Sequence, residues 1–155
     1  MKTVGIIGGL GPETTSEFYL DVVFSCQKIN KTARPSIIIS SVPLPYCIEE
    51  DAIIKSIGIE RIMPFLIKEA ERLQKAGADF IVMPCNSLHV FIEDIRKSVS
   101  IPVLSIVEET VKFLKDNNIQ YIYLPKIYQL PMAEGLYPIK KIFENEETNI
   151  YKVLE

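Results

Sequence analysis

Short apolar runs alternate with amphipathic helical patterns along the first 118 residues of this chain. The apolar runs begin at Val4, Ser36, Phe80 and Ile101, and the segments between them carry apolar residues at three- and four-residue spacing. This alternation favours parallel strands, because parallel neighbours need a long crossover that is usually a helix. The sequence therefore predicts an α/β fold in which helices flank a parallel sheet.

The period of the apolar residues also predicts where each element lies. Strands are expected at residues 4–7, 36–42, 80–83 and 101–106. Helices are expected at residues 13–27, 60–76, 86–97 and 108–116, with Pro12 opening the first helix and Gly77 capping the second. The pattern weakens past residue 118, where we expect strands at 119–124 and 149–154 and a short helix within 135–145.

Charge and length exclude several classes of protein. The 155 residues carry 17 basic and 20 acidic side chains, a net charge of −3 without a basic cluster, so nucleic acid is not an expected partner. The apolar runs are too short to span a membrane, and the N-terminal segment fits a first strand better than a signal peptide. We expect a cytoplasmic protein that does not interact with membranes.

Three cysteines, Cys26, Cys47 and Cys85, are widely spaced, and His89 is the single histidine. This spacing contains no metal-ligand cluster and no disulfide framework, so we expect neither a bound metal nor disulfides. Cys26 falls on the apolar face of its helix and is expected in the core. Cys47 is expected in a loop that begins at Pro43, without an assigned role.

Cys85 lies where a buried strand is expected to end and a helix to begin. Backbone N–H groups at a helix start can lower the pKa of a thiol, which makes Cys85 a candidate base or nucleophile. Asn86 and Ser87 supply polar groups that can cap the helix or bind a carboxylate. The alternative is a buried structural thiol. For His89 we favour a structural or solvent-facing role over tuning of the thiol.

A glycine-rich turn, Gly8-Gly-Leu-Gly-Pro12, follows the first expected strand. Glycines let the backbone approach a ligand closely, and the N-terminus of the next helix favours an anion. The dinucleotide fingerprint is not met, because Thr14 stands where its last glycine would be. We therefore expect Gly9 and Gly11 to contact a small carboxylate, with Thr14, Thr15 and Ser16 as possible hydroxyl donors. The alternative is an ordinary strand-to-helix turn.

Three segments, in order and with matching spacing, resemble the aspartate/glutamate racemase family. They are Gly8-Gly-Leu-Gly-Pro12 followed by Thr14-Thr15, Gly77-Ala-Asp-Phe-Ile-Val-Met-Pro-Cys-Asn-Ser-Leu-His89, and Ile101-Pro-Val-Leu-Ser-Ile-Val-Glu-Glu-Thr110. The resemblance implies a PLP-independent amino-acid racemase, an isomerase with two α/β lobes and the substrate between them. One cysteine from each lobe then faces the substrate α-carbon.

The family likeness also implies roles for particular residues. Cys85 matches the catalytic cysteine of the first lobe. The substrate-binding residues implied for the same lobe are Gly9, Gly11, Thr14, Asn86 and Ser87. The resemblance further implies an amino-acid or carboxylate substrate, no cofactor, and homodimers in many members.

The second-lobe cysteine motif of the family has no match here, and no cysteine follows Cys85. We therefore expect a first lobe at residues 1–112 and a truncated remnant of the second at residues 113–155. Apolar surface of the first lobe should then be exposed. Because one thiol cannot serve both faces of the α-carbon, two alternatives to a working racemase stay open. They are a non-catalytic carboxylate-binding remnant and a single-cysteine enzyme of the same superfamily.

Overall fold

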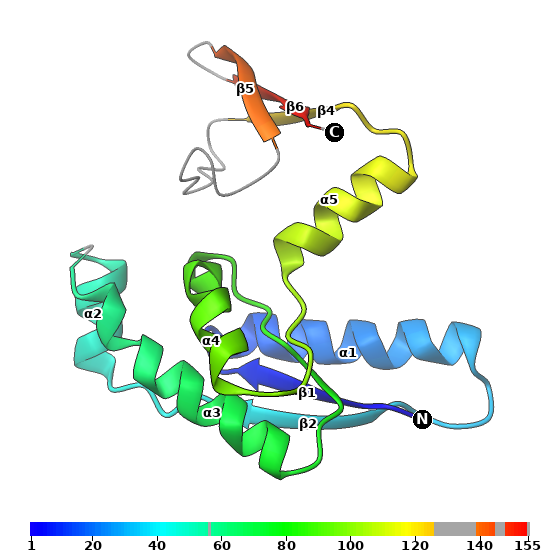
Figure 1. Cartoon of the computed structure of the whole chain (residues 1–155), viewed down its shortest axis with the longest axis vertical. Helices are drawn as coiled ribbons and strands as arrows, with labels where there is room; N and C mark the ends of the chain where they lie inside the picture. The colour runs from blue at the N-terminus through cyan, green and yellow to red at the C-terminus, as the bar shows by residue number, and fades with distance from the viewer. Residues whose placement is uncertain (56, 126–138, 145–147, 155) are drawn as a thin grey trace. The chain divides into compact units, whose positions relative to one another are not determined.

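A computed structural model describes residues 1–55, 57–125, 139–144 and 148–154 of the chain (Figure 1). The chain divides into two compact units, Met1–Ser105 and Ile106–Glu155. Among the described residues, none of the helices combines the length and apolar character needed to cross a membrane. The division at residues 112–113 that the family likeness suggests falls inside helix α5 (Ile106–Asp116) and stays a prediction.

The first unit is built on a parallel sheet in the order β2-β1-β3. Its strands are β1 (Thr3–Gly8), β2 (Ser36–Ser41) and β3 (Phe80–Val82), and β1 pairs with both neighbours. The predicted α/β class with a parallel sheet is confirmed. The strand expected at residues 101–106 is wrong in extent, because only Val103 forms a parallel bridge, with Ile81. Pro102 has no N–H to donate, and α5 already begins at Ile106.

Helices cover both faces of this sheet. Helix α1 (Pro12–Ile29) lies on one face and helix α3 (Met63–Lys75) on the other, as Figure 1 shows. A Cβ added at Gly8 would meet Thr15 of α1, whereas a Cβ at Gly5 would meet Leu73 of α3. The placement of the two helices follows from the strand order. The connection through α1 runs from β1 to β2, and the connection through α3 runs in the opposite direction, from β2 past β1 to β3. Right-handed crossovers in opposite directions place their helices on opposite faces.

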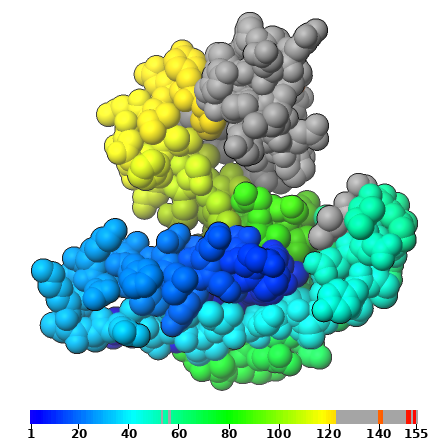
Figure 2. All heavy atoms as spheres, turned by 180° about the vertical axis from the view of Figure 1, so that it is seen from behind, coloured from blue at the N-terminus to red at the C-terminus, as the bar shows by residue number. Residues whose placement is uncertain are grey.

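The hydrophobic core lies mainly on the α3 side of the sheet. Fully buried side chains there come from the strands, from α3 and from helix α4 (Ile92–Ser98), and include Ile7, Leu66, Leu73, Ile81, Met83 and Ile95. On α1, by contrast, Thr15 is the one residue that is buried. Several large apolar side chains of α1 and β2 are exposed, among them Tyr19, Leu20, Phe24 and Ile39. Figure 2 shows the face of the first unit that α1 crosses.

Helix α3 ends as the sequence predicts. Gly77 has a φ of 91°, the left-handed region that favours glycine. The N–H of Gly77 donates to the carbonyl of Gln74 at 3.1 Å, and the N–H of Ala78 donates to that of Leu73 at 3.1 Å, which together form a Schellman cap. The start differs from the prediction, because residues Ile59–Arg61 form a short 3-10 helix, η1, before α3 begins at Met63.

Two further expectations for the first unit need correction. Cys47 was expected in a loop, but it lies in the first turn of helix α2 (Tyr46–Ile53). Pro45 has extended dihedrals and stands as the N-cap, so the prolines end before the helix and do not interrupt it. The single helix expected at 86–97 is divided into a 3-10 helix, η2 (Ser87–Phe91), and α4.

The second unit contains α5 and an antiparallel sheet in the order β4-β6-β5. Its strands are β4 (Tyr121–Pro125), β5 (Ile139–Glu144) and β6 (Thr148–Val153). Strands were expected near β4 and β6. The short helix expected within 135–145 is wrong over Ile139–Glu144, where the backbone pairs with β6; residues 135–138 and 145 lie outside the described part. Cross-strand pairing of this kind depends on a partner that a local apolar pattern does not include.

Candidate active site at the carboxyl edge of the parallel sheet

The strand order makes one position on the sheet edge the candidate binding site. Connections leave β1 toward β2 on one side, while β3 lies on the other side of β1. In open parallel sheets, ligands bind beyond the carboxyl ends of the strands where the connections diverge in this way. The turns after β1 and β3 meet this description. Gly9 and Cys85 each stand three residues beyond the paired residues Ile6 and Val82.

Hydrogen bonds hold the turn that carries Cys85. The N–H of Cys85 donates to the carbonyl of Met83 at 2.8 Å, and the N–H of His89 donates to that of Asn86 at 3.1 Å. The His89 ring is buried, and its Nδ1 lies 2.7 Å from the carbonyl oxygen of Cys85. That oxygen can only accept, so Nδ1 carries the hydrogen. His89 therefore has a structural role here and does not face solvent.

The Cys85 side chain is half-buried, with Asn86 and Ser87 exposed beside it. Burial raises the pKa of the Cys85 thiol above its ordinary value, while the backbone N–H groups of Leu88 and Ser87 lower the pKa and only partly offset burial. The expected lowering by a helix start is thus present, but the net direction is the reverse of the prediction. The helix that begins here is a five-residue 3-10 turn, too short for a strong dipole.

The raised pKa predicts slow alkylation of Cys85 at neutral pH. Only the thiolate reacts with iodoacetamide, so the rate should climb as pH rises, with a midpoint above the ordinary thiol value. In a Cys26→Ser/Cys47→Ser variant, which leaves Cys85 as the single thiol, the pH midpoint of labelling should fall when the chain is unfolded in guanidinium. A midpoint that does not change on unfolding would contradict the assigned desolvation of the sulfur.

Thr15 fixes the glycine-rich turn after β1. Its Oγ1 accepts the N–H of Gly9 at 2.9 Å and donates to the carbonyl of Gly11 at 3.0 Å. The carbonyl of Gly8 accepts the N–H of Val42 at 2.9 Å, which ties this turn to the end of β2. Gly9 has a φ of 85°, and a Cβ there would meet the Oγ of Ser41. Only glycine fits this position without strain.

The predicted substrate-binding residues are not equivalent in the structure. Gly9 and Gly11 are half-buried in the turn, and Gly11 is the N-cap of α1. Thr14 is exposed on the first turn of α1, while the adjacent Thr15 is buried and holds the loop. Helical side chains point back toward the helix N-terminus, and Thr15 stands four residues after Gly11. That spacing is compatible with the contact, but Thr14 stands three residues after Gly11 and shares the same helix face, so spacing alone does not choose between the two threonines.

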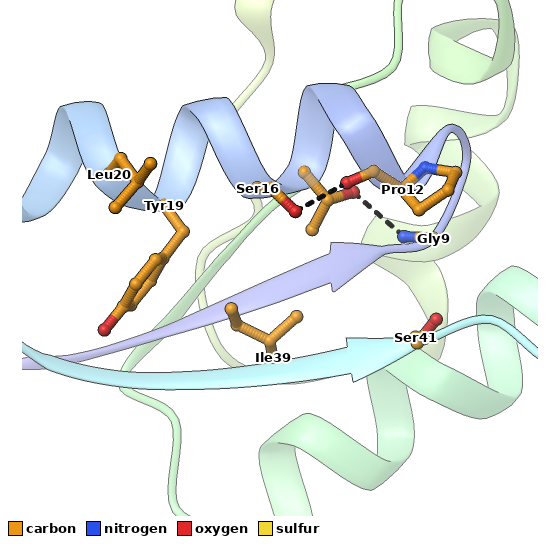
Figure 3. A pocket seen from close by; sticks show the side chains of 8 residues that line it. Gly9, Pro12, Ser16, Tyr19, Leu20, Ile39 and Ser41 are labelled. Atoms are coloured by element: carbon orange, nitrogen blue, oxygen red, sulfur yellow. Dashed lines mark hydrogen bonds between the residues drawn. The ribbon is translucent and has the colours of Figure 1, made fainter.

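A cavity of about 390 Å³ lies beside the glycine-rich turn, between α1 and β2 (Figure 3). Ser41 and Ile39 line it from β2, and Ser16 and Tyr19 line it from α1. In Figure 3 the hydroxyl of Ser16 bonds to the carbonyl of Pro12, a contact of 2.9 Å. No residue of the turn that carries Cys85 lines this cavity. Ser41 was not identified from the sequence, because its position depends on the pairing of β2 with β1.

The described residues place no three histidine, cysteine, aspartate or glutamate side chains where they could share a metal ion. All three cysteines are free thiols, with Cys26 half-buried on α1 and Cys47 exposed. The polar groups at the sheet edge are hydroxyls, an amide, backbone N–H groups and one thiol. This set suits recognition of a carboxylate together with proton transfer at an adjacent carbon.

The fold and the edge motifs define an open parallel α/β domain with a candidate ligand site at the carboxyl ends of its strands. Residues 7–121 match the family model described as Asp/Glu/Hydantoin racemase. The chain belongs to the Asp/Glu/hydantoin racemase family, as the sequence motifs predicted.

Individual relatives agree with this assignment. The chain is 38% identical over 113 residues to the broad specificity amino-acid racemase RacX of Bacillus subtilis, covering 70% of this chain and 48% of that protein. An aspartate racemase homologue from Pyrococcus horikoshii matches with a TM-score of 0.64 and 30% identity over 76% of this chain and 50% of the other. The Picrophilus torridus aspartate racemase shares the fold, with a TM-score of 0.60 and 22% identity over 75% of each chain. The chain thus spans about half the length of RacX.

Proposed function

We propose that this chain carries one half of a cofactor-independent amino-acid racemase site, in which the Cys85 thiol transfers the α-proton. The observation that supports this most directly is the place of Cys85 in the sheet. It follows β3, which pairs in parallel with β1, so the turn of Cys85 and the glycine-rich turn leave the same edge of the sheet from adjacent strands. Family membership supports an amino-acid substrate, and aspartate, glutamate and the wider range named for RacX are the candidates.

The proposed binding mode uses the polar groups of both turns. The substrate carboxylate lies against the side chains of Asn86 and Ser87, which are exposed at this edge. Gly9 and Gly11 let it approach the backbone, and Thr14 supplies a hydroxyl at the rim. Donors of this kind stabilise the charge that develops on the carboxylate when the α-proton leaves.

The proton-transfer step needs the thiolate form of Cys85. The sulfur takes the α-proton, the electron pair of the C–H bond moves into the carboxylate, and the thiol returns a proton to the same carbon. Burial makes the thiolate scarce at neutral pH and also makes it a stronger base. Return from the same sulfur restores the original configuration, so inversion requires a second proton donor on the opposite face of the substrate.

Incubation in deuterated water tests this function. L-Aspartate, L-glutamate and a panel of other L-amino acids would be incubated with the chain, with the α-proton followed by NMR and the configuration by chiral chromatography. We expect loss of the α-proton signal for at least one substrate. Exchange with inversion indicates a complete racemase, and exchange with retention indicates a one-faced, single-cysteine enzyme. Binding without any exchange would contradict the proposed chemistry and favour the carboxylate-binding alternative.

A further inference from the structure

A second cavity lies at the far end of α1 from the glycine-rich turn. It has a volume of about 360 Å³ and is lined by the last turns of α1 and the loop that leads to β2. Tyr19 and Leu20 also line the cavity beside Gly9, so the two hollows adjoin along α1. This volume is near the lower end of the range of small-molecule sites, which extends over roughly 300–1,000 Å³.

The basic side chains at this cavity have no acidic neighbours in the sequence. Residues 22–48 contain no aspartate or glutamate, whereas the whole chain has a net charge of −3. Lys31 and Arg34 line the cavity, and within the described residues neither takes part in a salt bridge or a side-chain hydrogen bond. Lys28 stands in the last turn of α1, where it offsets the partial negative charge of the helix end. Lys31 and Arg34 remain available for an anion.

The other walls of the cavity suit an apolar body. Leu20, Val23 and Phe24 of α1 line it, and the Phe24 side chain is 57% exposed. The amide of Gln27 lies between these residues and the basic loop along the helix. In Figure 2 the atoms of α1 spread across this face of the first unit without another described helix of that unit over them. An aromatic ring offers a large apolar contact area, and a guanidinium matches the geometry of carboxylate and phosphate groups, so the two together suit an amphipathic anion.

We propose that this cavity binds small organic anions that join an aromatic or alkyl body to a carboxylate, phosphate or sulfonate group. The guanidinium of Arg34 provides a planar pair of donors for such a group, and Lys31 adds a second positive charge. The body of the ligand covers Phe24 and Leu20. The site is distinct from the proposed racemase site, because none of its lining residues belongs to the turns after β1 and β3.

A fluorescence titration of the whole chain with 8-anilinonaphthalene-1-sulfonate tests the proposal. We expect one probe per chain, bound more weakly as salt is added. Lys31→Gln/Arg34→Gln should weaken binding about five- to tenfold, the effect of two partly exposed ion pairs. The matched control is Lys68→Gln/Lys75→Gln, which removes the same charge from exposed positions of α3 on the other face and should leave affinity unchanged.

Two further measurements, with an uncharged probe and with a Phe24→Ala variant, define which results would overturn the proposal. The uncharged probe N-phenyl-1-naphthylamine should bind more weakly than the sulfonate to the unmodified chain, and Phe24→Ala should weaken both probes. Equal losses in the test and control double variants would show that only net charge matters. If the uncharged probe binds as well as the sulfonate, the hollow is merely an apolar patch. If sedimentation shows a dimer that must dissociate before the probe binds, the face is a protein interface and the site is rejected.

Discussion

Replacing Cys85 with alanine is expected to abolish α-proton exchange. The thiol is the only group at this edge of the described first unit that we assign as a base, and loss of a general base costs about 10²–10⁴-fold in rate. The measurement is the rate of loss of the substrate α-proton signal in deuterated water. Cys85 is half-buried beside the core, so its replacement can also affect folding. The circular dichroism spectrum and thermal transition of the Cys85→Ala variant should therefore be recorded as well.

Three variants separate the chemistry of Cys85 from its packing. Cys85→Ser keeps a similar shape but replaces the thiol with a hydroxyl, a much weaker acid, so exchange should be lost while the fold is kept. Cys47→Ala and Cys26→Ala serve as controls, since Cys47 is exposed in α2 and Cys26 is half-buried on α1. Exchange that persists in Cys85→Ala at the unmodified rate would remove Cys85 from the mechanism.

Gly8→Ala should lower the free energy of unfolding by about 1–3 kcal/mol, the usual cost of overpacking a core position. A Cβ at Gly8 would lie 2.5 Å from Cγ2 of Thr15 and 3.2 Å from Cγ2 of Ile39. Thr15 cannot rotate away freely, because its hydroxyl is bonded to both Gly9 and Gly11. Chemical denaturation at constant pH measures the loss, provided that the slope of the transition is unchanged.

A double-mutant cycle identifies the atom responsible. Thr15→Ser deletes Cγ2 but keeps the hydroxyl, and on its own should cost about 0.8 kcal/mol for the lost methyl group. Gly8→Ala/Thr15→Ser should be more stable than the sum of the single changes predicts, by about 1 kcal/mol. Gly11→Ala is the matched control: its φ is −61°, and its added Cβ would approach only the flexible carboxylate of Glu13, at 3.2 Å. Strict additivity of Gly8→Ala and Thr15→Ser would show that the clash is relieved elsewhere.

The buried polar contacts between helix and sheet could not be found from the sequence. Glu69 lies on the apolar face of α3 and is completely buried, where it accepts a hydrogen bond from Ser40 and pairs with Arg72 at 3.0 Å. A buried carboxylate is costly unless it is paired, so its position depends on Ser40 being opposite it in β2. That pairing depends on the register of the sheet, which local periodicity does not encode.

The direction of the pKa shift of Cys85 likewise could not be predicted from the sequence. The sequence correctly suggested backbone N–H groups near the sulfur, and those of Ser87 and Leu88 are there. Burial has the larger effect, because the thiol packs against the core cluster of the first unit. Desolvation depends on which residues surround the sulfur in three dimensions, and the sign of the shift could not be read from neighbours in the chain.

Sequence alone determined the parallel α/β class and the turns where Cys85 and the glycines stand, because apolar period, proline and glycine act locally on the backbone. The family was predicted from the resemblance of three motifs. Only the tertiary structure decided that Thr15, and not Thr14, anchors the first turn, that α2 carries Cys47, and that residues 139–144 form a strand. These outcomes depend on contacts between segments far apart in the chain. Side-chain surroundings, and with them the ionisation of Cys85, are set by those contacts.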